Sequence, residues 1–259
     1  ESGPADISII VIDQVSLESV HKSLDHRWPW PREFYAKMLG FLKTAGARAV
    51  VFDMFFSEPD RDHEGILGED SDAALVAATH YAANVFHSYV PQREGLSPRP
   101  DELAAIIEAS GFPGMVAPRA GNGLRRFSTG ALPSAALTEA AAGIGFATVE
   151  KERDNICRRI QLVATLSDAT VMCQSLAIYR GLHDDLELSM KPGRIQAGAH
   201  SIQTDGAASA FLRWYRPAPG KRTPYPQHSA FDVLRAGVRL ENDLDPELDL
   251  ADFKDKIIY

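Results

Sequence analysis

The stretch PREFYAKMLGFLKTAGARAVVFD, residues 31–53, carries the pattern that decides the fold. Its first half places apolar side chains at helical spacing, with Pro31 and Gly46 where a helix typically begins and ends. Its second half, ARAVVFD (47–53), is a short apolar run that predicts a buried strand. A similar run, ISIIVID (7–13), comes earlier. The order strand, helix, strand predicts a βαβ unit with parallel strands.

The same alternation continues after this unit. Residues 71–82 predict a second crossover helix, capped by Ser71 or Asp72. Residues 84–90 predict a third parallel strand. The fold class that follows is α/β, a single domain over residues 1–259 with a mixed, partly parallel central sheet flanked by helices.

The second half of the chain gives weaker signals. Two β-type runs flank the turn residues Asp154 and Asn155, which predicts a hairpin. FDVLRAG predicts a short helix ended by Gly237. FKDKIIY (253–259) predicts the beginning of a strand, from which we expect the sequence to be a domain excised from a longer chain.

Composition excludes some classes of protein. The 259 residues are 45% hydrophobic and 24% charged, and their formal net charge of -8 argues against nucleic-acid binding. No run of about 18 apolar residues is present to cross a membrane. Cys157 and Cys173 are too few for a disulfide framework, and whether they pair with each other stays open.

Two aspartates end successive predicted strands. Ligands bind beyond the carboxyl ends of strands in open α/β sheets, so Asp13 and Asp53 mark an edge of interest. Arg32 begins the helix at this edge and is the expected partner of one of them. The group is either a structural ion pair, a ligand or cation pocket, or a pair of catalytic carboxylates. Oxygen ligands for a metal would come from these aspartates with Asp60 or Glu58.

Motifs of known chemistry are missing from the sequence. We find no nucleophile elbow, phosphate-binding loop, zinc-binding HExxH or dinucleotide fingerprint, and the eight histidines are scattered. We therefore predict no catalytic residue, no metal and no cofactor. The basic pairs Arg125-Arg126 and Arg158-Arg159 stand out in an acidic chain. They are either solvated and paired with carboxylates or directed at an anionic ligand.

Several of these segments together resemble a known family. IVID-x-x-S (10–16), WPWPR (28–32) and AVVFDMFFSEPD (49–60) are similar to the opening of the second type of CHASE domain. GIGFATVEKERDNICRRI (143–160) resembles a later stretch of that family, except that Asn155-Ile156 stands where the family tends to have Asp-Gly. The positions that fall on the pattern are Asp13, Ser16, Trp28, Pro29, Trp30, Pro31, Arg32, Asp53, Phe56 and Asp154.

The resemblance implies an extracellular sensor domain. Such domains lie outside the cytoplasmic membrane in bacterial receptors, anchored by transmembrane helices of the parent chain. Their output domains are nucleotide cyclases, diguanylate cyclases or kinases. The resemblance implies an unknown small ligand or a physical stimulus, and a homodimer is expected by analogy with outputs that work in pairs. We expect ligand contacts from Asp13, Ser16, Trp28, Trp30, Arg32, Asp53, Phe56 and Asp154.

The sequence therefore leaves two main functional hypotheses. The first is a sensor without chemistry of its own, which shifts between two arrangements when its stimulus arrives. The second is an α/β enzyme that uses Asp13 and Asp53, with a divalent cation. A third reading, that the domain only mediates association, needs no ligand.

Overall fold

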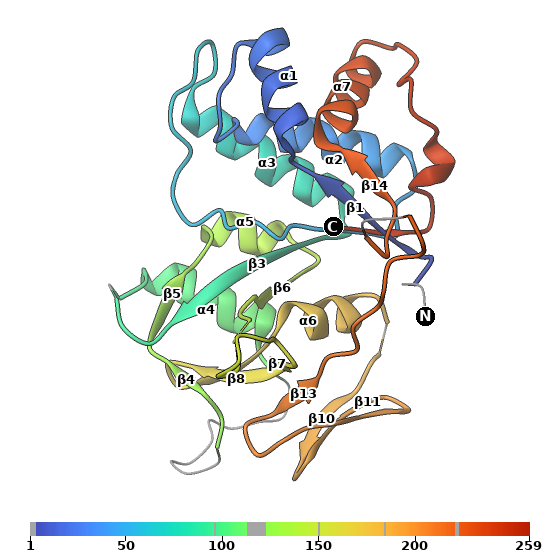
Figure 1. Cartoon of the computed structure of the whole chain (residues 1–259). Coiled ribbons are helices and arrows are strands. Elements are labelled where there is room, and N and C mark those ends of the chain that lie inside the picture. Colours follow the sequence, from blue (N-terminus) through green and yellow to red (C-terminus); the bar gives the residue numbers. More distant parts are fainter. Residues whose placement is uncertain (1–3, 96, 113–122, 150, 184, 221–222) are drawn as a thin grey trace. The chain divides into compact units, whose positions relative to one another are not determined.

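The computed structural model confirms a mixed α/β fold with a partly parallel central sheet (Figure 1). The chain divides into two compact units, and each is described by itself. The prediction of a single domain stays a prediction. The structure describes all residues except 1–3, 96, 113–122, 150, 184 and 221–222. The first unit comprises residues 1–51, 58–85 and 215–259, and the second comprises residues 52–57 and 86–214.

Four parallel strands form the sheet of the first unit. Their order is β14 (Gln227–Ser229), β1 (Ile7–Val11), β15 (Ile257–Ile258) and β2 (Ala49–Val51). The strands predicted at 7–13 and 47–53 are therefore present and parallel in direction. They are not neighbours, because the strand at the end of the chain lies between them and pairs Ile257 with both Ile7 and Ala49.

Helices gather beside this sheet (Figure 1). The predicted helix 31–45 is α2 (Arg32–Thr44), which packs against both α3 (Gly68–Ala82) and α7 (Ala230–Glu241). A 3-10 turn, η1 (Leu250–Asp252), precedes the last strand. Pro31 immediately precedes α2, and Gly46 follows it with a φ of 74°. Buried residues of α2 are Phe34, Tyr35, Met38, Leu39, Phe41 and Leu42.

Two helices of the first unit differ from the sequence prediction. Helix α3 begins at Gly68, upstream of Ser71 and Asp72, because both of these side chains bind other parts of the unit instead of capping the helix. Helix α1 (Gln14–Leu24) was not predicted, since only Val20 and Ser16 are buried on it and its apolar pattern is weak.

The second unit is built around strand β3 (Val85–Gln92), whose first residue belongs to the first unit. It pairs in parallel with β6 (Gly143–Phe146) and antiparallel with β5 (Thr129–Ala131). The helices of this unit are α4 (Pro100–Ser110), α5 (Ala135–Ala140) and α6 (Gln174–Gly181). The remaining strands form three small sheets: β4 (Arg126–Phe127), β8 (Val163–Leu166) and β9 (Ala169–Met172); β10 (Leu188–Lys191), β11 (Arg194–Ala197) and β12 (His200–Gln203); and β7 (Arg159–Gln161) with β13 (Ser209–Phe211).

The predicted hairpin around Asp154 and Asn155 is wrong in its strand pairing. The turn itself is present, with Asn155 at a φ of 66° and the Glu152 N–H donating to the Ile156 carbonyl at 3.0 Å. The flanking strands, however, pair elsewhere: β6 with β3, and β7 with β13. Period-2 patterning shows that a segment is a strand but does not choose its partner.

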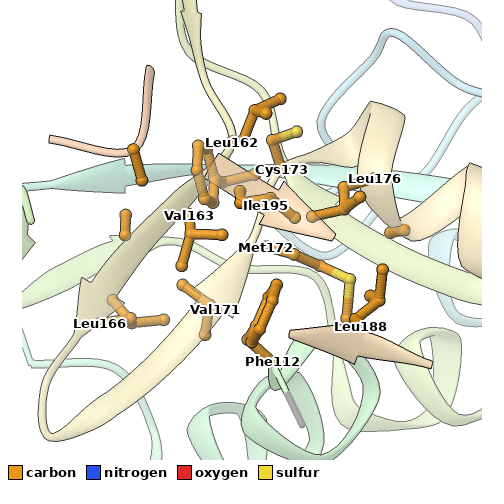
Figure 2. Packing of buried hydrophobic residues seen from close by; sticks show 14 of the residues in the cluster. Phe112, Leu162, Val163, Leu166, Val171, Met172, Cys173, Leu176, Leu188 and Ile195 are labelled. Atoms are coloured by element: carbon orange, nitrogen blue, oxygen red, sulfur yellow. The ribbon is translucent and has the colours of Figure 1, made fainter. Parts of the chain in front are cut away.

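Strands β8 and β9 and helix α6 enclose the main hydrophobic core of the second unit (Figure 2). Val163, Val171 and Met172 are fully buried there. Cys173 lies in the same cluster, and burial raises the pKa of its thiol to about 11. Cys157 is only partly buried, and both cysteines are free thiols.

Gly237 does not end α7, as the sequence predicted, but lies within it. A Cβ at this position would come within 2.3 Å of the Lys37 carbonyl oxygen on α2. The missing side chain therefore lets the two helices approach closely, and tertiary packing outweighs the low helix propensity of glycine.

We predict that Gly237→Ala destabilises the protein by about 1–3 kcal/mol, because overpacking would push α7 away from α2. The matched control is Gly40→Ala, also inside a helix, where a Cβ would meet nothing within 4 Å. That control should stabilise by about 0.5–1 kcal/mol through helix propensity. Urea unfolding followed by circular dichroism measures both, and equal effects of the two substitutions would contradict the packing argument.

Candidate functional site

Arg32 holds the beginning of α2 to two other segments of the first unit. Its guanidinium Nη1 donates to Oδ1 of Asp72 on α3 at 2.6 Å, and its Nη2 donates to the Glu58 carbonyl. Its backbone N–H donates to Oδ2 of Asp60 at 2.9 Å. Asp13 or Asp53 is the partner predicted from the sequence, whereas the structure pairs Arg32 with Asp72. The ion pair is structural in character, since both side chains tie secondary-structure elements together.

Asp60 is the centre of this network. Besides the Arg32 N–H, its carboxylate accepts from the Ser71 hydroxyl at 2.6 Å and lies 3.1 Å from His63 Nε2. The Asp60 N–H in turn donates to Asp72 Oδ2 at 3.0 Å. Burial alone would raise the pKa of the Asp60 carboxyl, yet the hydrogen bonds from Ser71, Arg32 and His63 outweigh it and hold that pKa below its ordinary value of 3.8.

Asp13 and Ser16 form the N-terminal cap of α1. Asp13 Oδ1 accepts from the Ser16 N–H at 2.8 Å, and this bond lowers the pKa of Asp13. The buried Ser16 hydroxyl lies 3.1 Å from the Ser229 hydroxyl of β14. These two predicted site residues therefore fix α1 to the sheet.

The two tryptophans of WPWPR differ in exposure. Trp30 is 2% exposed and Trp28 is 49% exposed, and their rings meet edge to face at 5.8 Å. Trp30 also lies 6.3 Å from the Tyr35 ring of α2. Trp30 is thus part of the core of the first unit, and Trp28 covers it on the outside.

Phe56 and Asp53 belong to the short segment 52–57 of the second unit. Phe56 is buried and meets the rings of Phe52 and His87 edge to face at 5.4 and 5.7 Å. Phe52 stacks on His87 at 5.0 Å. Phe56 is therefore a packing residue of the second unit, while Asp53 is exposed.

Asp154, the last predicted site residue, lines a polar cavity of the second unit. The cavity has a volume of about 650 Å³, which falls in the range of small-molecule sites. It is formed by the segment before and within the 152–156 turn, by β7 and by the loop that leads into β13. Its lining residues are Arg125, Thr148, Lys151, Glu152, Arg153, Asp154, Arg159, Gln161, Asp205, Ala207 and Ser209.

One wall of this cavity is a fixed hydrogen-bonded loop. Asp205 Oδ1 accepts from the backbone N–H groups of Ala207 and Ser209, both at 2.9 Å. The buried Gln161 side chain accepts from the Ser209 hydroxyl at 3.2 Å and donates to the Val163 carbonyl at 2.6 Å. Because these groups satisfy one another, the wall is organised by the protein itself.

An ion-pair cluster includes two of the lining carboxylates, Glu152 and Asp154. Arg158 holds Asp154 through two contacts, of 2.7 Å to Oδ2 and 3.0 Å to Oδ1, and it also lies 3.0 Å from Glu152 Oε2. The bonds from Arg158 lower the pKa of Asp154. This geometry is the bidentate fork that arginine forms with carboxylates.

Sequence reasoning found this cavity only in part. It named Asp154 through the family resemblance and noted both arginine pairs, from which Arg125 and Arg159 line the cavity. It gave no signal for Gln161, Asp205 or Ser209, because they lie far apart in the chain and match no motif. Within the described part of the chain, no group of three or more metal-ligating side chains is close enough to hold a metal ion. Among the same residues, no helix has the length and apolarity of a membrane span.

The structure is thus a mixed α/β fold with a polar cavity in its second unit. The chain matches the model of the CHASE2 domain over residues 1–259, its whole length, and belongs to this family. CHASE2 domains are sensory domains of the extracellular type. Neither the curated proteins nor the solved structures contain a match to the chain.

The Asp60 network predicts an acid-sensitive contribution to stability. Since the folded-state pKa of Asp60 lies below 3.8, its contribution is present above pH 3.8 and is lost as the pH falls through the folded-state value. Asp60→Asn should lower the free energy of unfolding by about 2–4 kcal/mol at neutral pH.

The measurement is urea unfolding of both proteins from pH 7 down to pH 3. The difference between wild type and variant should shrink below pH 3.8. A difference that stays constant over this range would show that the carboxylate charge of Asp60 does not stabilise the fold.

Proposed function

We propose that the chain is the extracytoplasmic sensory module of a bacterial transmembrane receptor. In this proposal it detects a stimulus outside the cytoplasmic membrane and passes it to a cytoplasmic output domain, a nucleotide or diguanylate cyclase or a kinase. The observation that carries the proposal is the CHASE2 match over the whole chain. The module itself performs no chemistry.

The pairing of the two ends of the chain supports a role in transmission. The Ile257 N–H donates to the Asp6 carbonyl at 2.8 Å, and the Tyr259 N–H donates to the Ser8 carbonyl at 3.0 Å. The first and last strands are therefore bonded directly to each other. In a receptor, these hydrogen bonds would transmit a displacement of one strand directly to the other strand and to the segment connected to it.

The alternative of an α/β enzyme has less support. It depends on Asp13 and Asp53 as a strand-end carboxylate pair. One carboxylate oxygen of Asp13, however, accepts the hydrogen bond that caps α1. We propose instead that the stimulus is a small ligand bound in the cavity beside Asp154, and that the parent receptor works as a homodimer.

Membrane topology tests the proposal. Ser201 is exposed on β12, so Ser201→Cys in the full-length receptor, in a Cys157→Ser background, provides a surface thiol. A membrane-impermeant maleimide should label this thiol in cells whose cytoplasmic membrane is intact. A cysteine placed in the output domain of the same receptor is the control and should be labelled only after lysis. Labelling of Ser201→Cys only after lysis would place the module inside the cell and overturn the proposal.

A further inference from the structure

We infer that the cavity of the second unit binds a small organic anion that carries carboxylate or phosphate groups. The inference rests on the proposed function only for the role of this anion as a stimulus, because binding itself follows from the residues of the cavity.

The balance of charge in the cavity is opposite to that of the chain. The lining contains four cationic side chains and three carboxylates, and a fifth cation, Arg158, holds two of those carboxylates. The chain as a whole carries a formal net charge of -8. A local positive excess on an acidic protein attracts anions and raises their concentration at the site.

The carboxylates of the lining are largely engaged by the protein. Arg158 holds Asp154 and Oε2 of Glu152, and Asp205 accepts two backbone N–H groups at the entrance to β13. Oε1 of Glu152 accepts no hydrogen bond from the described residues, and the cation beside it is Arg159, at 3.6 Å. A cationic ligand or a metal ion would have to compete with these partners. The acidic groups of the cavity therefore shape its walls and are poorly placed to bind a cation.

Three of the lining cations have room for a further partner. Lys151 and Arg153 are exposed and form no hydrogen bond or ion pair with any residue that the structure describes. Arg159 lies 3.6 Å from Glu152 Oε1, beyond hydrogen-bond distance, and its guanidinium stacks on the Phe211 ring at 4.6 Å. A guanidinium that lies over an aromatic ring can still donate its N–H groups to an oxyanion.

Arg125 adds a cation from a different part of the chain. Burial, and then the neighbouring Arg93, lower the pKa of Arg125, while the Asp205 carboxylate raises it. Its position depends on Gly123, whose φ is 78° and where a Cβ would lie 2.3 Å from the Gly206 carbonyl oxygen. The absence of a side chain at Gly123 lets the Arg125 segment lie against the loop that carries Asp205.

The size of the cavity selects among anions. A volume of about 650 Å³ exceeds what an inorganic ion fills and suits an organic molecule with several polar groups. Guanidinium groups bind carboxylate and phosphate through paired hydrogen bonds, so two or more such groups on one ligand would engage Arg125 and Arg159 together.

Isothermal titration calorimetry on the purified chain tests the inference. The probes are citrate, glycerol 3-phosphate, inorganic phosphate and, as a neutral polyol of similar size, glucose, all at matched ionic strength. We expect at least one of the organic anions to bind, inorganic phosphate to bind more weakly and glucose not to bind. Arg125→Gln and Arg159→Gln should each weaken binding of that anion about ten-fold or more, because each removes a charged hydrogen bond.

The matched control is Arg194→Gln, which removes an exposed arginine of the same unit from β11, outside the cavity lining. It should leave the affinity unchanged, and circular dichroism with urea unfolding checks that all three variants are folded. The inference is overturned if no anion of the panel binds, if glucose binds equally well, or if Arg194→Gln weakens binding as much as Arg125→Gln and Arg159→Gln. Each of these results is independent of the membrane topology, so failure here leaves the proposed sensory role to its own test.

Discussion

The position of β15 between β1 and β2 is the constraint on which the rest of the first unit depends. Two residues near the end of the chain, Ile257 and Ile258, supply the backbone hydrogen bonds that join the first strand to the second. The first unit is therefore assembled from three separate parts of the chain, and the second unit is inserted between them in sequence. Such long-range strand pairing costs loop-closure entropy before its contacts stabilise the fold, so the helices that cover the sheet must supply compensating burial.

Local signals in the sequence were sufficient for the elements around α2. The spacing of its apolar residues, Pro31 before it and Gly46 after it all depend on neighbours in the chain, and the structure confirms them. The pairing of β2 with β15 could not be predicted from the sequence, because a strand of two residues carries no pattern that identifies its partner. The prediction for Gly237 was wrong for a related reason. The absence of a side chain is required there by the backbone of Lys37 on another helix, which is distant in the sequence.

The candidate site divides in the same way. The family pattern located Asp13, Ser16, Trp30 and Arg32, and the structure gives each a role in holding the first unit together. A motif is easy to recognise when its residues are close together in the sequence. Residues that cap a helix or pack around its first turn are necessarily close in the sequence. The cavity, in contrast, takes side chains from segments as distant as Arg125 and Ser209, so only the turn residue Asp154 connects it to the pattern.

This division separates the residues that hold the fold together from those that would bind the proposed ligand. The Asp60 network and the α1 cap involve groups whose hydrogen bonds are satisfied within the first unit, and a ligand would have to break them in order to bind. In the proposed anion site, by contrast, the exposed cations Lys151 and Arg153 bind no residue that the structure describes, so an anion would break no such bond there. An anion that binds them stabilises the arrangement in which they converge over any arrangement in which they separate. A sensor needs this differential affinity, since a ligand shifts an equilibrium only by as much as it prefers one state to the other.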